Sequence, residues 1–174
     1  MQNIPAKFNS ENKELKGNEE MEKFDIIMGM DIFVGYIKSI KFDWVNNKMT
    51  FSNDRTQKDL PYKFIFFDAK PISLMSIGQK TFTVLLDTGS PVDLIDKEIY
   101  KNNYTTKEEK KYGTFIYNEY TVPVKIGDDK ITLKTVDYKP NFNLKLNDEM
   151  IDFIIGNNHK SLTFDLVNNF YKLD

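Results

Sequence analysis

Cysteine is absent from this chain of 174 residues. The fold can therefore contain neither disulfide bonds nor thiolate metal sites, and it must be stabilised by packing alone. Histidine occurs once, at His159, so a metal site built from several histidines is excluded and we assign His159 to a surface turn. No metal ion and no cofactor is expected.

Neither sign of charge dominates, because 24 basic residues stand against 26 acidic ones and the net charge is -2. A chain with this balance offers no large basic field for nucleic acid and no polybasic patch for a membrane surface. Residues 1–18 are rich in Asn, Lys and Glu and lack an apolar run, so they contain neither a secretory signal nor a membrane span. We expect no nucleic-acid partner, no membrane, and an intracellular, cytoplasmic location.

Short runs of Phe, Tyr, Ile, Val and Thr, separated by Asn-Asn, Gly and Asp-Asp, dominate the chain. This pattern predicts an all-β fold. The candidate strands are residues 64–67, 72–77, 81–86, 114–117, 120–126, 131–136, 153–155 and 162–166. We predict turns at Gly78-Gln79 and Gly127-Asp128-Asp129, and residues 92–100 fit either a short helical turn or an irregular strand.

A partial internal repeat organises the chain. Residues 20–31 resemble residues 149–158, and residues 40–47 (IKFDWVNN) match residues 162–169 (LTFDLVNN). The first copy, residues 21–51, contains only the end piece of the unit that the second copy completes. The expected division is a polar, disordered N-terminus (1–20), the partial repeat (21–51), a polar linker (52–59) and a main domain (60–174).

The main candidate for chemistry is Asp87-Thr88-Gly89-Ser90, which follows the predicted strand 81–86. A carboxylate at the end of a buried strand is costly unless it is paired or hydrogen-bonded, so it indicates either chemistry or a well-satisfied turn. An ordinary Asx turn before a glycine fits the tetrapeptide equally well. The rest of the sequence must decide between the two.

That wider sequence resembles the aspartic proteases. In this family a hydrophobic strand delivers Asp-Thr/Ser-Gly-Ser/Ala, and a second apolar pair followed by Gly crosses the same loop system, here Ile154-Ile155-Gly156. The chain is similar to the single-lobe retropepsins, above all those of long-terminal-repeat retrotransposons of the Ty3/gypsy type, over residues 72–173. Residues 21–51 resemble the closing stretch of the same proteases. The resemblance implies a closed, retropepsin-like barrel and an aspartic endopeptidase.

The resemblance also assigns roles to the residues of the two loops. Asp87 would be the catalytic carboxylate, and the hydroxyl of Thr88 would brace the loop of a partner subunit. Gly89 would let the backbone approach the carboxylate closely, and Ser90 would hydrogen-bond its outer oxygen. Ile154-Ile155-Gly156 would form the second loop.

A hairpin that covers the site, the flap of this family, would lie between Lys107 and Tyr120. Its tip would be at Tyr112-Gly113-Thr114. The charge run 107–111 by itself is interpreted as a solvated loop.

Peptide hydrolysis by this chemistry needs two carboxylates, one as general base on a water and one as general acid. The first copy of the repeat lacks an Asp-Thr/Ser-Gly, so the second carboxylate must come from another chain. A homodimer that binds an extended polypeptide is therefore implied.

Two alternatives stay open. One is a catalytically inactive interaction or dimerisation module with the retropepsin fold, derived from a retroelement; loss of the helix after Gly156 would favour it. In the other, the two copies of the repeat pack within one chain as a pseudo-symmetric pair, with residues 21–51 supplying strands but no acid.

Overall fold

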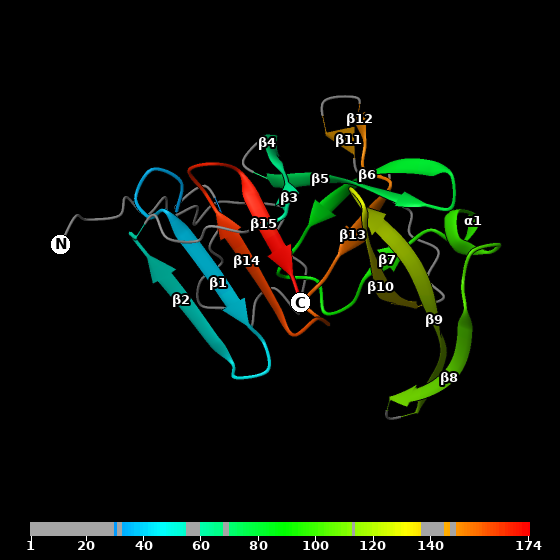
Figure 1. The fold of residues 1–174 in the computed structure, drawn as a ribbon. Coiled ribbons are helices and arrows are strands. Elements are labelled where there is room, and N and C mark those ends of the chain that lie inside the picture. Colours follow the sequence, from blue (N-terminus) through cyan, green and yellow to red (C-terminus); the bar gives the residue numbers. More distant parts are fainter. Residues whose placement is uncertain are drawn as a thin grey trace.

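The computed structural model in Figure 1 describes residues 30, 33–54, 60–67, 70–112, 114–136, 145–146 and 149–174. In this part of the chain the structure is mostly β-sheet, which confirms the all-β prediction, and α1 (Lys97–Tyr100) is a single helical turn. The expected N-terminal segment 1–20 and most of the expected linker lie outside the described residues. No helix in the described ranges is both long and apolar enough to cross a membrane.

The strands form a five-stranded sheet, an eight-stranded sheet and one short pair. Their bounds are β1 (Ser39–Asp43), β2 (Lys48–Ser52), β3 (Tyr62–Lys63), β4 (Ile65–Phe67), β5 (Lys70–Ile77), β6 (Lys80–Leu86), β7 (Leu94–Ile95), β8 (Thr106–Tyr112), β9 (Phe115–Ile126), β10 (Asp129–Val136), β11 (Lys145–Leu146), β12 (Glu149–Met150), β13 (Phe153–Ile155), β14 (Ser161–Asp165) and β15 (Phe170–Leu173).

The larger sheet has the order β10-β9-β5-β6-β13-β7, with β4 beside β5 and β8 beside β9. The β5–β6 hairpin turns at Gly78, whose φ of 62° suits glycine, and the β9–β10 hairpin turns at Gly127, so both predicted turns are confirmed. The first and last strands of the path, β10 and β7, are joined by an isolated bridge between Asp93, which precedes β7, and Thr135, and by a hydrogen bond from the N–H of Ile95 to Oγ1 of Thr135. No continuous ladder between the described strands closes this sheet into a barrel.

The segment 106–126 differs from the sequence prediction. The two expected strands 114–117 and 120–126 are one strand, β9, and the charged run that we interpreted as a solvated loop is the neighbouring strand β8. Ladder hydrogen bonds to β9 hold β8 in place, with Tyr112 opposite Phe115. Exposed charge is common on such edge strands because it prevents them from pairing with other chains.

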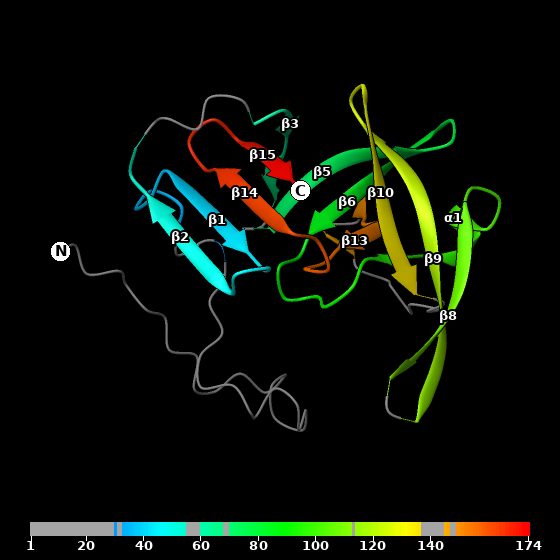
Figure 2. The ribbon, with the colours of Figure 1, turned by 60° about the horizontal axis from the view of Figure 1, so that its bottom comes forward.

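The smaller sheet has the order β2-β1-β14-β15-β3 and contains both copies of the repeat. The hairpin β1–β2 comes from the first copy, β14–β15 comes from the second, and β1 pairs with β14. Figure 2 shows the four strands side by side at one end of the molecule, while the β8–β9 hairpin projects from the other. The two copies therefore pack against each other within one chain.

The core lies where the two sheets approach. Phe164 and Tyr171 of the smaller sheet are fully buried, and Phe64 packs against both rings at centroid distances of 5.3 and 6.3 Å. The hydroxyl of Tyr171 donates to Ser73 of β5, which in turn donates to the carbonyl of Lys63. Aromatic packing and this buried hydrogen-bond chain join the smaller sheet to the larger one.

Candidate functional site

Strand β6 carries the candidate carboxylate to the middle of the larger sheet. Its last three residues, Val84, Leu85 and Leu86, are buried between β5 and β13. Asp87 follows directly and is half-buried. The sequence Val-Leu-Leu before Asp therefore fixes the carboxylate at the end of a strand that is supported on both sides.

The turn after β6 is closed by local hydrogen bonds. The N–H of Gly89 donates to Oδ1 of Asp87 at 2.9 Å, and the N–H of Ser90 donates to the backbone carbonyl of Asp87 at 3.2 Å. The hydroxyl of Ser90, which we expected on the carboxylate, donates instead to the carbonyl of Val92 at 2.7 Å. The carboxylate thus receives a backbone N–H from its own turn.

A second loop holds this turn from the other side. Strand β13 lies between β6, to which it is parallel, and β7, to which it is antiparallel. The N–H of Asp87 donates to the carbonyl of Ile155 at 2.9 Å, and the N–H of Asn157 donates to the carbonyl of Ser90 at 2.7 Å. The side-chain amide of Asn157 also donates to the carbonyl of Thr88 at 3.3 Å. Ile154-Ile155-Gly156 and Asp87-Thr88-Gly89-Ser90 are therefore brought together.

Gly156 is the glycine that this crossing requires. A Cβ atom there would lie 2.3 Å from the carbonyl oxygen of Val92 and 2.7 Å from that of Ser90, both backbone atoms. At Gly89 an added Cβ would lie 3.2 Å from Oδ1 of Asp87, a tight contact but not an overlap. The backbone at Gly89 therefore lies close to the Asp87 carboxylate, and the tighter approach at Gly156 is to backbone carbonyls of the neighbouring loop.

Asp93 is a buried carboxylate that our sequence analysis did not single out. It is fully buried, and its oxygens accept the N–H of Gly156 at 3.0 Å and the N–H of Lys134 at 3.2 Å. The side-chain amide of Asn158 adds a contact of 3.3 Å. Asp93 thereby ties the start of β7 to β10 and to the loop after β13.

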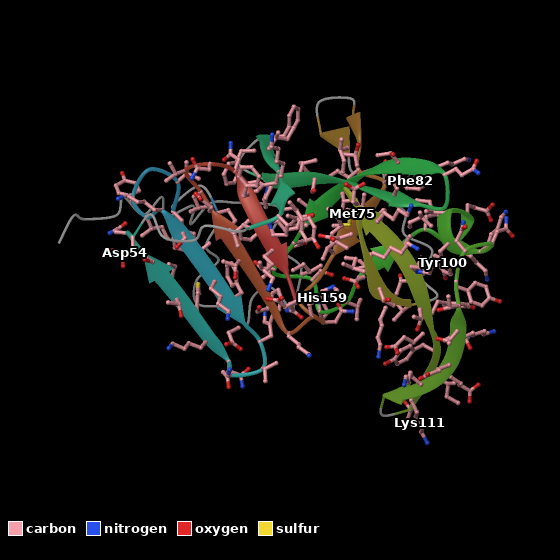
Figure 3. All side chains as sticks on the ribbon, viewed as in Figure 1. Asp54, Met75, Phe82, Tyr100, Lys111 and His159 are labelled. Carbon is pink, nitrogen blue, oxygen red and sulfur yellow. The ribbon has the colours of Figure 1, made fainter. Side chains whose placement is uncertain are left out.

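The placement of His159 in a surface turn was wrong. Its Nε2 lies 2.9 Å from Oδ1 of Asp93, and its side chain is 11% exposed. Figure 3 shows His159 at the junction between β13 and β14, where the two sheets approach each other. Burial of the His159 ring is tolerated because its Nε2 has a hydrogen-bonding partner in the buried carboxylate of Asp93.

The β8–β9 hairpin lies where we expected the flap. Its register sets Tyr112 opposite Phe115 at the end of the ladder, and Thr114, which precedes β9, is exposed. Gly113 and the side chain of Tyr112 lie outside the described residues. Figure 3 labels Lys111 near the free end of the hairpin, away from the body of the sheets. Whether this hairpin acts as a flap stays a prediction.

No protein-family model matches the chain, and no curated protein matches it in sequence. What the site can do must therefore be inferred from its own residues. They supply a half-buried carboxylate, a turn with its own hydrogen bonds and a second loop that holds the turn. Such a group is able to exchange a proton with a bound water, and a second acid is needed for concerted hydrolysis.

Proposed function

We propose that this protein is an aspartic endopeptidase that hydrolyses an extended polypeptide, with Asp87 as one of two catalytic carboxylates. The observation that carries the proposal is the fixed position of the Asp87 carboxylate. It stands at the end of the buried strand β6, and its turn is held to the loop after β13 by backbone hydrogen bonds at Asp87 and Asn157. Fixed geometry of this kind is what a catalytic acid or base requires.

The loop after β13 supports the proposal because its backbone packs tightly against the turn that carries Asp87. Gly156 passes so near to the carbonyls of Ser90 and Val92 that only a glycine fits without displacement. Asp93 accepts the N–H of Gly156 and so fixes the position of Gly156 beside the Asp87 turn. The proposed fold is accordingly retropepsin-like, with the bridge between Asp93 and Thr135 as the contact at which the larger sheet would close into a barrel.

In the proposed reaction a water molecule lies between two carboxyl groups that share one proton. The ionised carboxylate takes a proton from the water, the hydroxide attacks the peptide carbonyl, and the protonated carboxyl donates to the carbonyl oxygen. The carbon–nitrogen bond then breaks as the amine receives a proton. Two carboxylates about 3 Å apart cannot both be ionised, so the pair holds one proton, and activity is expected at acidic to neutral pH.

The second carboxylate is proposed to be Asp87 of a second copy, which makes the active species a homodimer. Thr88 would brace the loop of that second copy, and the β8–β9 hairpin, with Tyr112-Gly113-Thr114 at its tip, would cover the substrate. The substrate itself would bind as an added strand, recognised through its backbone.

Cleavage of an unstructured protein substrate between pH 4 and 7 tests the proposal. We expect the wild-type chain to cleave and Asp87→Asn to be inactive, because the amide can neither take nor give the proton. Activity per chain should rise with protein concentration if a dimer is the active form, and a statine-type peptide should inhibit it.

The matched control is Asp128→Asn, which makes the same chemical change in the exposed turn between β9 and β10. It should keep wild-type activity and the wild-type unfolding midpoint. Equal cleavage by the wild type and Asp87→Asn, or none by the wild type at any concentration, would reject the peptidase.

A second candidate function is a catalytically inactive retropepsin-like module that mediates interaction or dimerisation. The loop of residues 156–160 favours it, because this loop enters β14 without a helix. Wild-type protein that dimerises without cleaving substrate would support this candidate.

A further inference from the structure

The smaller sheet contains a local two-fold symmetry that the sequence repeat alone does not reveal. Residues 38–47 and 160–169 correspond one to one and share Lys, Ser, Phe, Asp, Val and two Asn at equivalent positions. Strands β1 and β14, which belong to these segments, pair antiparallel with Lys41 opposite Thr163. Lys41 and Thr163 are themselves equivalent, so the symmetry axis passes between them.

The cross-strand pairs between β1 and β14 are related by this two-fold axis. Ile40 faces Phe164 and Phe42 faces Leu162, and exchanging the two copies of the repeat converts one pair into the other. At the two ends of the ladder Ser39 faces Asp165 and Asp43 faces Ser161, which are again related by the same exchange.

The backbone hydrogen bonds that flank the ladder obey it too. The N–H of Trp44 donates to the carbonyl of Lys160 at 3.1 Å, and the equivalent Leu166 donates to Lys38 at 2.8 Å. Hydrogen-bonded pairs alternate with open pairs along an antiparallel ladder, so Lys41 and Thr163 form an open pair.

The turns of the two hairpins are also equivalent. Asn46 donates its N–H and its side-chain amide to Asp43, and Asn168 does the same to Asp165. The next residue, Asn47 or Asn169, has a positive φ of 49° or 59°. The β1–β2 hairpin therefore has the same turn structure as the β14–β15 hairpin.

We propose that β14 is a dimerisation strand for a second copy of this chain, and that the β1–β2 hairpin covers it. In the covered state the chain is a latent monomer. When the hairpin leaves, β14 of the second copy takes the place of β1 in the same register. This inference rests on the proposed function only for its consequence, the activity of the dimer.

The second copy fits because β1 already resembles it. With two β14 strands on the same axis, Leu162 would face Phe164 of the second copy, which is almost the present pair of Ile40 and Phe164. Thr163 would face Thr163 of the second copy, which removes the charge of Lys41 from the ladder. All five residues of β14 are buried, so its free edge would strongly favour a partner.

The hairpin is held by β1, whose Ile40 is fully buried, and by its connection to the same chain, whereas β2 contributes little. Strand β2 is exposed at all positions but its last, with Phe51 46% and Met49 40% exposed, so it buries little apolar surface. A tethered partner, however, acts at an effective concentration on the order of millimolar. Cover and dimer are therefore in competition, and the outcome depends on protein concentration.

A single introduced cysteine tests whether β14 pairs with β14 of a second copy. The natural chain has no cysteine, so any disulfide must involve the introduced residue. In full-length Thr163→Cys the two cysteines would meet on the axis of the dimer, where an open antiparallel pair has Cα atoms about 4.5 Å apart, a distance that a disulfide can span. Under mild oxidation we expect a covalent dimer on a non-reducing gel, in severalfold larger yield than for Thr50→Cys, a cysteine on the exposed strand β2. Equal yields would overturn the proposal.

The double variant Lys41→Cys/Thr163→Cys tests the cover. Its oxidation should give an intramolecular disulfide that locks the monomer and abolishes dimer formation until it is reduced. A mixture of Lys41→Cys chains with Thr163→Cys chains should give no disulfide that joins a Lys41→Cys chain to a Thr163→Cys chain. A mixed covalent dimer would instead mean that β1 of one chain sits on β14 of another, and it would overturn the proposal.

Two matched core variants in the Thr163→Cys chain distinguish loosening of the β1–β2 hairpin from damage to β14 itself. Ile40 and Leu162 are equivalent and both are fully buried. Ile40→Ala weakens only the cover and should raise the rate of cross-linking at least about tenfold, whereas Leu162→Ala damages both states and should not. Ile40→Val is the milder step if Ile40→Ala unfolds the protein, and an increase by Leu162→Ala equal to that by Ile40→Ala would contradict the proposal.

Cleavage by the covalent Thr163→Cys dimer distinguishes this inference from the proposed function. A cross-linked dimer without peptidase activity would leave the dimerisation strand in place and reject the peptidase. Peptidase activity that depends on Asp87, with no cross-linking above the Thr50→Cys control, would reject the dimerisation strand and keep the enzyme.

Discussion

Asp93 shows how much a single buried side chain contributes to this fold. Its carboxylate accepts the backbone N–H groups of Lys134, in β10, and of Gly156, directly after β13, and it contacts His159. A buried carboxylate is tolerated only when hydrogen bonds replace the water that it has lost. Asp93 therefore acts as a joint between β7, β10 and the loop that holds the candidate catalytic turn.

Replacing Asp93 should destabilise the protein strongly. In Asp93→Ala the N–H groups of Gly156 and Lys134 lose their acceptor inside the protein, and we expect a loss of about 3 kcal/mol or more in the free energy of unfolding. Asp93→Asn keeps one acceptor oxygen and should lose less. Urea denaturation measures both, and a loss below about 0.5 kcal/mol for Asp93→Ala, the level expected for exposed Asp128→Ala, would contradict this role.

At the scale of the element, the hairpin turns depend on one carboxylate each. Asp165 accepts the N–H groups of Val167 and Asn168 and the side-chain amide of Asn168. Burial raises the pKa of Asp165, but these three hydrogen bonds outweigh burial and hold the pKa below its usual value. Asp43 makes the equivalent turn between β1 and β2, and hydrogen bonds from Asn46 lower its pKa as well.

The lowered pKa of Asp165 predicts how stability changes with acid. A carboxyl group whose pKa is lower in the folded state stabilises that state above its unfolded pKa of about 3.9, and the contribution is lost as the pH falls through the folded pKa. Asp165→Ala should therefore cost about 1 to 2 kcal/mol at pH 7, and the difference from wild type should shrink below about pH 4.

Urea denaturation between pH 2.5 and 7 checks this expectation. Asp43→Ala, at the more exposed of the two turns, is the matched variant and should cost less than Asp165→Ala. A difference between Asp165→Ala and wild type that stays constant down to pH 2.5 would contradict the assigned role of the carboxylate.

The elements that could be predicted from the sequence were those with strong local signals. Strands such as β5 and β6, with a glycine turn between them, follow from apolar runs and turn residues alone. Strand β8 does not follow from its local pattern, because its charged side chains match a loop and its ladder to β9 provides the structure; only the resemblance to a flap implied a hairpin there. Asp93 was missed for a related reason, since its partners Lys134 and His159 are distant in the sequence.

At the scale of the whole molecule, the two copies of the repeat complete one sheet within a single chain. The sequence indicated two copies, but their antiparallel pairing on an axis between Lys41 and Thr163 became visible only in the structure. The same pairing that completes the smaller sheet in one chain occupies the place that a second copy would need. Under the proposed dimerisation, folding and association would compete for one strand, β14.

Hydrogen exchange of the wild-type protein should reveal this competition as a local opening. We expect the amides of β1 and β2 to exchange at least about tenfold faster than those of β15, because the hairpin, whose strand β2 is exposed, can detach while the ladder of β14 and β15 and the core around Tyr171 stay intact. Mass spectrometry of peptides from residues 39–52 and 161–173 provides the measurement. Oxidised Lys41→Cys/Thr163→Cys, in which the hairpin is tied down, should lose most of the difference. Equal exchange rates for the two hairpins in the wild type would mean that the smaller sheet opens only as a unit, and β14 would then be available to a second copy only after global unfolding.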